Sequence, residues 1–297
     1  MTIRFNLLTA VVLAGLVQPA IAAQNLSKRA TVAADAIVDV SNVQGSVKVT
    51  AWDRNEVELS AMLESDRDRL EFEATDRQVR IKVQRPDGRY RDSDDALLTL
   101  KVPPGVRLNV NTVSADITVD GVRGEQRLKS VSGDVRTSSY DQPVSLHSVS
   151  GDVTLTGSGG KAQVSTENVS GTTVVNGIRG GFEGEAVSGN IKAGVAAAER
   201  LRVSSVSGDV EISTDLSPAA RVEMESVSGT IALSIKPPVN VEFEIESFSG
   251  DIDSCFGTKP RDKSKYGPGS ELEYTEGSGG ARVMIQTLSG DIDICDR

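Results

Sequence analysis

The sequence predicts an all-β protein that folds as a parallel β-solenoid, or β-helix, with roughly 18–21 residues per coil. A six-residue phrase, Ser-Val-Ser-Gly-Asp-Val at residues 205–210, recurs with variations through the second half of the chain. Its fourth residue falls at positions 115, 133, 151, 171, 189, 208, 229 and 250, so successive copies are 18, 18, 20, 18, 19, 21 and 21 residues apart. A near-constant period of this size indicates stacked supersecondary units. Aromatic residues make up only 4% of the chain, and an aliphatic core suits narrow stacked strands.

The first residues are typical of an export signal. Arg4 precedes an apolar run over residues 5–17, and the small residues of Ala20-Ile21-Ala22 follow it. The run is too short to span a bilayer as a helix. We therefore expect residues 1–22 to be a cleaved signal peptide and residues 23–35 to be a flexible start of the mature chain. With no second long apolar run, the mature protein is expected to lack a transmembrane segment and to lie in the periplasm or on the cell surface of a bacterium.

The charge balance excludes one class of partner. Without Arg4 the chain has 31 basic and 42 acidic side chains, a formal charge of 31 − 42 = −11. Nucleic acids and anionic lipids are bound non-specifically by basic surfaces, so no nucleic-acid partner is expected.

Residues 36–111 lack regular copies of the phrase but contain short runs in which apolar and polar residues alternate, such as 57–63, 79–83 and 98–102. Alternation with a period of two predicts half-buried strands. This region is expected to be an irregular, strand-rich start of the solenoid.

Residues 112–297 are expected to form the regular solenoid. In each unit two alternating runs flank a change of phase, which at Ser204-Ser205 predicts a corner. Copies of each strand then pair in parallel, about 4.7–4.9 Å apart. The glycine of the phrase is expected at a tight bend or close approach. We expect one inward apolar row, formed by Val43, Val113, Val131, Val149, Val169, Val187, Val206, Val227, Phe248 and Leu288.

Other all-β folds explain the repeat less well. An antiparallel sandwich does not require one phrase at one phase in every unit. A propeller blade needs about twice the period, and a hexapeptide helix needs a six-residue sub-period that the chain lacks.

Two polar rows of the phrase are expected to support the stack. The serines before the glycine are predicted to form an outward hydroxyl ladder. The position after the glycine holds Asp in six copies, and short acceptors such as Thr172, Asn190 and Thr230 in others. Acceptance of hydrogen bonds from nearby backbone amides explains the whole set, whereas a calcium row would be interrupted by the threonines.

No catalytic residue, cofactor site or metal site is predicted. His147 is the single histidine, and no nucleophile turn accompanies it. A serine row is not nucleophilic without a base. We expect His147 to be an exposed corner residue.

The densest acidic group is at the C-terminal end, where Asp251, Asp253, Asp291 and Asp293 occupy matching outward positions. Four carboxylates could hold a cation or cleave a glycan. A solvated strand face is the favoured interpretation, because alternate outward residues are normally polar.

The two cysteines, Cys255 and Cys295, end matched phrases. Residues 258–280 are rich in Gly, Lys, Ser and Pro, and we interpret them as a loop inserted into one coil. The matched phrases then become neighbours, and an exported protein with two cysteines is expected to form a disulfide between them.

These phrases, together with Trp52-Asp53-Arg54 and Val102-Pro103-Pro104-Gly105, resemble the bacterial adhesin-like domain of unknown function that is also called toastrack-like. The resemblance covers nearly all of the mature chain. It implies a β-solenoid of the cell envelope with an adhesive or scaffold role, and it supplies no catalytic residues. We therefore expect a non-enzymatic envelope protein that binds a protein or a polysaccharide. The alternative is a glycan-cleaving enzyme that uses the C-terminal acidic cluster. The sequence leaves the partner's identity and the oligomeric state open.

Overall fold

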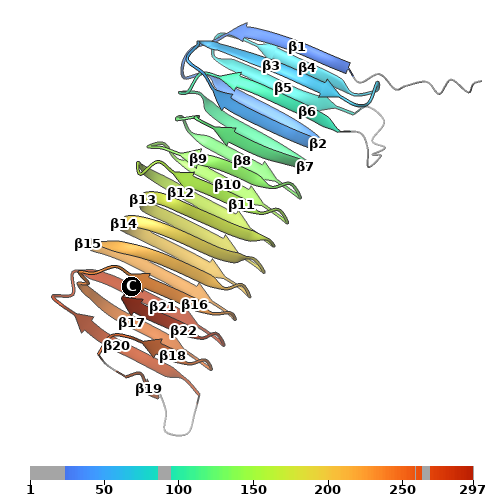
Figure 1. Ribbon diagram of the computed structural model, residues 1–297. Coiled ribbons are helices and arrows are strands. Elements are labelled where there is room, and N and C mark those ends of the chain that lie inside the picture. Colours follow the sequence, from blue (N-terminus) through green and yellow to red (C-terminus); the bar gives the residue numbers. More distant parts are fainter. Residues whose placement is uncertain (1–23, 86–94, 258, 263–267, 297) are drawn as a thin grey trace, which may run out of the picture.

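The computed structural model describes residues 24–85, 95–257, 259–262 and 268–296, and the expected signal peptide lies outside them. The chain forms a parallel β-solenoid whose strands stack side by side along one axis (Figure 1). Among the described residues there is no helix with the length and apolar character needed to cross a bilayer.

Each regular coil has two strand faces. On the first face, β10 pairs in parallel with β8 and β12. On the second face, β11 pairs in parallel with β9 and β13. The phrase forms the corner that leads from the first face to the second. The strands of the regular part are β7 (Arg107–Asp120), β8 (Gln126–Ser130), β9 (Val135–Ser139), β10 (Val144–Ser148), β11 (Val153–Gly157), β12 (Lys161–Asn168), β13 (Thr172–Ala186), β14 (Asn190–Ser205), β15 (Val210–Ser226) and β16 (Ile231–Ile235).

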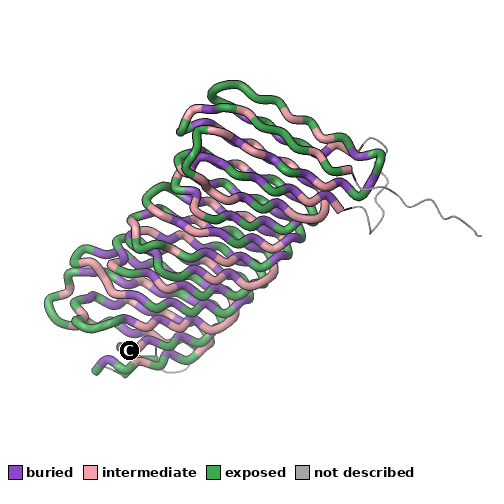
Figure 2. The backbone as a smooth tube through the Cα atoms, turned by 45° about the horizontal axis from the view of Figure 1, so that its top comes forward, coloured by how far each residue is buried: buried purple, intermediate pink, exposed green. Residues whose placement is uncertain are grey.

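The core lies between the two faces. Val144 and Leu146 of β10 are buried opposite Val153 and Leu155 of β11. Figure 2 shows the alternation of buried and exposed residues that repeats from strand to strand. One coil cannot bury its apolar side alone, so neighbouring coils share a continuous aliphatic core.

The structure corrects the phase that was predicted for the phrase. Val206 is 47% exposed, whereas Ser205 before it is 5% exposed. The alternation of β14 therefore continues inward through Ser205, and the phase changes at Val206-Ser207. The row that was predicted to point inward instead lies on the surface, half-buried at Val43 and Val149 and exposed at Val113, Val131, Val169, Val187, Val206, Val227, Phe248 and Leu288.

The corner is held from within by the first residue of the phrase. The Oγ of Ser205 accepts a hydrogen bond from the N–H of Gly208 at 3.0 Å and donates one to its carbonyl oxygen at 3.0 Å. A Cβ at Gly208 would lie 1.9 Å from the carbonyl oxygen of Gly189 in the neighbouring coil. The glycine is required because adjacent corners approach each other at backbone distance.

The N-terminal end is an antiparallel cap on the parallel stack. Its strands are β1 (Gln24–Thr31), β2 (Ile37–Ala51), β3 (Glu56–Leu63), β4 (Arg69–Ala74), β5 (Gln78–Gln84) and β6 (Ala96–Val102). β2 lies between β7 on one side and β5 with β6 on the other. β4 pairs antiparallel with β5, β3 with β6, and β1 with β3. Residues 24–31 therefore form an ordered strand, in contrast to the flexible segment expected from the sequence.

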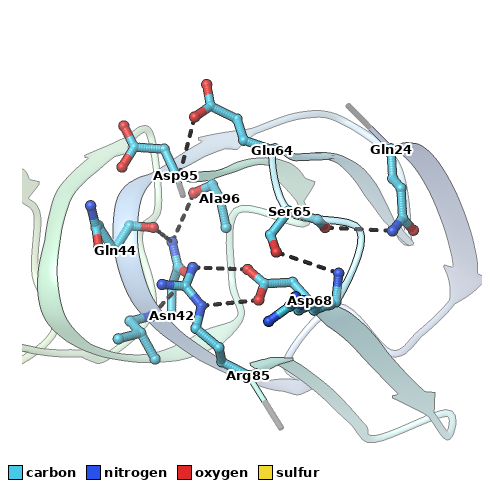
Figure 3. Close-up of polar contacts among 11 residues, drawn as sticks. Gln24, Asn42, Gln44, Glu64, Ser65, Asp68, Arg85, Asp95 and Ala96 are labelled. Carbon is cyan, nitrogen blue, oxygen red and sulfur yellow. Dashed lines mark hydrogen bonds and ion pairs between the residues drawn. The ribbon is translucent and has the colours of Figure 1, made fainter. Parts of the chain in front are cut away.

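A buried ion pair fastens this cap. The guanidinium of Arg85 donates hydrogen bonds to both carboxylate oxygens of Asp68, at 2.9 and 2.8 Å. The two side chains are 6% and 0% exposed. Figure 3 shows the pair beside Asn42, whose amide nitrogen donates to the carbonyl oxygen of Ala96 at 2.9 Å.

At the C-terminal end the order of coils departs from the order of the chain. The strands here are β17 (Val241–Ser247), β18 (Ile252–Ser254), β19 (Arg261–Asp262), β20 (Ser270–Glu276), β21 (Ala281–Thr287) and β22 (Ile292–Asp296). β21 pairs with both β15 and β17, and β22 pairs with both β16 and β18. The last coil is thus inserted between two earlier ones. Part of the expected inserted loop, residues 258–280, forms β20, which pairs antiparallel with β17 and caps this end.

Candidate functional site

The exposed row lines a groove that runs along the phrase corner, parallel to the solenoid axis. The groove has a volume of about 740 Å³ and crosses β10, β12, β13, β14, β15, β21 and β17. It has two walls and a floor, each made of one residue per coil. This surface is the most distinctive candidate site on the described part of the chain.

One wall is apolar. Its side chains come from the second position of the phrase and are at least 40% exposed. Coils that pair in register place them about 4.7–4.9 Å apart, which makes a continuous apolar stripe. In stacking order the wall consists of Val169, Val187, Val206, Val227, Leu288 and Phe248.

The facing wall is acidic. It carries the residues that lie two positions before the apolar wall, which point outward from the ends of the first-face strands. His147 stands at one end, where its Nδ1 lies 2.7 Å from the Oε2 of Glu167. In stacking order the wall consists of His147, Glu167, Glu185, Ser204, Glu225, Gln286 and Glu246.

The floor is the backbone of the residues that lie between the two walls, and its polar groups are already paired. In stacking order these residues are Asn168, Ala186, Ser205, Ser226, Thr287 and Ser247. The carbonyl oxygen of Ser205 accepts the N–H of Val227 at 3.1 Å, and the carbonyl oxygen of Ala186 accepts the N–H of Val206 at 3.1 Å. The side chains of the floor residues point inward and are buried. The floor therefore has no free backbone row on which a ligand could form a β-ladder.

The outward serines beside the groove bind backbone, not each other. Ser207 Oγ donates to the carbonyl oxygen of Val187 at 3.2 Å, and Ser170, Ser228 and Ser289 do the same with a valine of the preceding coil. The predicted hydroxyl-to-hydroxyl ladder is thus replaced by hydroxyl-to-carbonyl bonds. The same carbonyl oxygens also accept the backbone N–H of each serine, so the hydroxyl groups add to a contact between corners that the backbone already makes.

The aspartate row has the predicted role. Asp134 Oδ1 accepts the backbone N–H of Asp152 at 3.0 Å, and Asp209 Oδ1 accepts that of Thr230 at 2.9 Å. Asn190 occupies the same position and accepts the N–H of Asp209 at 3.0 Å. Asp and Asn are interchangeable here because each has a short side chain whose Oδ1 can approach the backbone, whereas Thr172 and Thr230 enter the row through their own N–H groups, which donate to Asp152 and Asp209.

One member of the C-terminal acidic cluster, Asp291, belongs to this ladder. Asp291 Oδ1 accepts the N–H of Asp251 at 3.0 Å, and Asp253 lies beside Asp293 in register. All four are exposed. No group of three or more His, Cys, Asp or Glu among the described residues is arranged to hold a metal ion.

A disulfide joins Cys255 to Cys295, the pairing that the matched phrases predict, with the Cα atoms 4.9 Å apart. It connects the coil of β18 to the inserted coil of β22. His147, expected at a corner, instead lies half-buried on β10 at the end of the acidic wall.

The groove was missed in the sequence because apolar residues were assigned to the core. A signal for it is present in the phrase. Each wall residue stands between two small residues, mostly serine, as in Ser205-Val206-Ser207 and Ser247-Phe248-Ser249. Around Val206, four other apolar residues already fill the core, namely Leu201, Val203, Val210 and Ile212, so the fifth is available for the surface.

The solved structures to which this chain is similar include three proteins of Bacteroides and Parabacteroides species. A candidate adhesin of Bacteroides fragilis is 12% identical, with 92% of this chain and 97% of that chain covered and a TM-score of 0.44. A candidate lipid-binding protein of Parabacteroides distasonis is 12% identical over 91% and 96%, with a TM-score of 0.49. A candidate adhesin of Parabacteroides merdae is 8% identical over 92% and 96%, with a TM-score of 0.38.

The comparison with functionally curated proteins gives no match. A family model, however, matches residues 35–295, which include every strand from β2 to β21, most of β22 and the disulfide. The chain belongs to the toastrack DUF4097 family.

Proposed function

We propose that the chain is a non-enzymatic binding protein of the bacterial cell envelope and that its partner binds in the apolar groove. The observation that carries the proposal is the apolar wall, six aliphatic or aromatic side chains aligned over adjacent coils and exposed to solvent. Contiguous apolar surface on a water-soluble fold is characteristic of interaction sites. Such a surface would be costly to maintain without a partner that covers it.

The lining favours a polypeptide partner over a polysaccharide. The apolar wall is aliphatic except for Phe248, so a sugar ring would have one aromatic face to stack on and would find hydrogen-bond partners only on the facing wall. Burying a hydroxyl without a partner costs free energy, whereas burying an apolar side chain releases it. A protein segment with apolar side chains matches this chemistry better.

An extracytoplasmic location is supported by the disulfide between Cys255 and Cys295, because such bonds persist in oxidising compartments. The expected signal peptide at residues 1–22 agrees with export. Binding is favoured over catalysis because Asp291, in the acidic cluster, repeats the backbone contact of the other coils, and the other three aspartates are exposed outward residues of the strand ends.

Site-specific photo-crosslinking in the native envelope tests the proposal. A photoreactive residue at Val206 or Val227, on the apolar wall, is expected to yield one defined protein adduct. The matched controls are Thr156 and Ser213, exposed positions on the second face, which should not yield it. Equal adducts at all four positions, or none at the groove, would overturn the assignment of the groove.

The enzymatic alternative has its own test. The purified protein is incubated with cell-envelope glycans, and released fragments are measured. The proposal expects no turnover. Release of fragments that is lost in Asp253→Asn or Asp293→Asn would overturn it, because these exposed substitutions should leave the fold intact.

A further inference from the structure

We infer that the occupant of the groove is a cationic amphipathic helix supplied by another polypeptide. The inference rests on the proposed function, in which the groove binds a partner, and it adds the partner's charge and conformation. Three features carry it: the charge of one wall, the pairing of the floor and the length of the apolar stripe.

The acidic wall selects a cationic partner. Glu167, Glu185, Glu225 and Glu246 face the apolar wall along its length. Glu185 and Glu225 are exposed and form no ion pair with any residue in the described part of the chain. Among the described residues that line the groove, His147, at one end, is the one basic side chain. Like charges along an apolar surface attract a partner of opposite charge and disfavour one of the same charge.

The floor selects a helix over an extended strand. Each carbonyl oxygen of the floor already accepts an N–H from the neighbouring coil, as Asn168 does from Val187 at 3.1 Å and Ser226 from Leu288 at 3.2 Å. A strand in the groove would leave its own backbone groups unpaired against an apolar wall, which is costly. A helix satisfies its backbone internally and needs only an apolar side chain every three or four residues.

The length of the stripe sets the length of the helix. From Val169 to Phe248 the wall spans five strand spacings, or about 24 Å. At 1.5 Å per residue, this corresponds to about 16 helical residues. The proposed helix has one apolar face that packs on the apolar wall, and it carries Lys or Arg along the flank that meets the glutamates of the acidic wall.

Charge also argues against two other occupants. A second copy that packed groove to groove would bring two acidic walls together, which is unfavourable. An anionic lipid would meet the same repulsion, although a neutral acyl chain would not. Both alternatives appear as outcomes of the test.

The test measures binding of synthetic helical peptides to the purified protein by fluorescence anisotropy at low and physiological salt. The first peptide has 16 residues, with leucine along one face of the helix and lysine along its flanks. The second has glutamate in place of each lysine. The third is the lysine peptide with two prolines at its centre, which prevent it from forming a continuous helix. We expect the lysine peptide to bind at least about tenfold more tightly than either other peptide, with an affinity that falls as salt rises. Circular dichroism should show a gain of helix on binding.

Charge reversal supplies the decisive variants. Glu185→Lys combined with Glu225→Lys should lower the affinity for the lysine peptide by about tenfold or more and raise the affinity for the glutamate peptide. The control, Asp120→Lys with Asp141→Lys, changes net charge equally at exposed positions outside the groove and should change neither affinity by more than about twofold. Tighter binding of the glutamate peptide to the charge-reversed variant would show that the variant is folded, which excludes misfolding as the cause of weaker lysine-peptide binding.

Equal affinity for both charged peptides, or no effect of the reversal, would overturn the charge selection. Undiminished binding of the proline peptide would overturn the helix. A neutral acyl probe that binds while no peptide does would assign the groove to a lipid chain, and concentration-dependent dimers without peptide binding would assign it to a second copy. Each of these results leaves the groove as a binding site, whereas an absence of crosslinks at Val206 would remove that broader proposal.

Discussion

The Oγ of Ser205 and the backbone N–H of Gly208 form a 3.0 Å hydrogen bond inside the corner of their coil. The same contact recurs between Ser130 and Gly133, Ser148 and Gly151, Ser247 and Gly250, and Thr287 and Gly290. The repeated hydroxyl is therefore a buried structural group. By turning inward it lets the chain direct the next residue, a valine in most coils, to the surface.

Removing this hydroxyl should destabilise the coil. Ser205→Ala leaves the N–H of Gly208 buried without a partner, and we expect a loss of about 1–2 kcal/mol in local stability. Ser207→Ala is the matched control, since it removes an exposed hydroxyl and should cost less than about 0.5 kcal/mol. Amide hydrogen exchange at Gly208 measures both. Equal effects would mean that the inward hydroxyl has no special role.

Adding a methyl group to the glycine should have a larger effect. In Gly208→Ala the new Cβ would lie 1.9 Å from the carbonyl oxygen of Gly189, and backbone of two coils must separate. We expect a loss of about 3 kcal/mol or more, measured by denaturant unfolding. Gly257→Ala is the control, because its nearest neighbour would be the Tyr274 hydroxyl at 3.7 Å. A small loss at Gly208 would show that the corners are loosely packed.

The solenoid could be predicted because a parallel stack in register repeats its side chains, and the spacing of the phrase records that repeat directly. The direction in which the valine of the phrase points could not be predicted. In Ser205-Val206 a period-two pattern gives two possible phases, and apolarity alone favoured burial of Val206. The correct phase depends on a hydrogen bond from Gly208 that makes a buried serine tolerable. This bond forms only in the folded corner and cannot be read from the alternation of residues. The sequence therefore did not predict that Val206 is exposed, or that a groove exists.

The order of the coils was also beyond the sequence. Neighbouring positions for Cys255 and Cys295 follow from their matched phrases, and they do form a disulfide. The sequence does not indicate that β21 enters between β15 and β17. All copies of a repeat offer similar edges, so a strand can pair with either neighbour. In the structure the antiparallel cap strand β20 pairs with one edge of β17, which leaves the other edge for β21.

The buried ion pair of the N-terminal cap gives a third prediction. Asp68→Asn removes one charge of a buried pair in which the guanidinium of Arg85 donates two hydrogen bonds to the carboxylate. We expect a loss of about 3–5 kcal/mol in the stability of the cap, because removing one partner of a buried, hydrogen-bonded ion pair is strongly destabilising. Glu73→Gln is the control within the same hairpin, since its contact with Arg80 is exposed at 3.8 Å and should contribute less than about 1 kcal/mol. Thermal unfolding of both variants checks the difference, and similar values would contradict it.

The disulfide should stabilise the C-terminal coils in particular. Replacing Cys255 and Cys295 with serine is expected to cost about 2–4 kcal/mol. Hydrogen exchange should accelerate in β18 and β22, which the bond connects, and remain unchanged in β2 and β7 at the other end. Because Leu288 belongs to the inserted coil, the double variant should also weaken binding in the groove. Uniform acceleration along the whole chain would contradict a local role.

The attachment of β1 should depend on pH through Glu58. Lys101 and Arg29 both donate hydrogen bonds to its carboxylate, and together they lower the pKa of Glu58 below its ordinary value of 4.5. A lowered pKa in the folded state means that the unfolded chain binds the proton more readily. The contribution is therefore complete above pH 4.5 and is lost as pH falls through the folded value. Since Arg29 lies on β1 and Lys101 on β6, protonation should loosen the pairing of β1 with β3.

We expect the hydrogen-exchange protection of β1 amides, corrected for intrinsic rates, to fall as pH drops below 4.5. In Glu58→Gln the protection should be lower at neutral pH and nearly independent of acidification, and a midpoint at or above 4.5 for the Glu58 carboxyl by NMR would contradict the assignment.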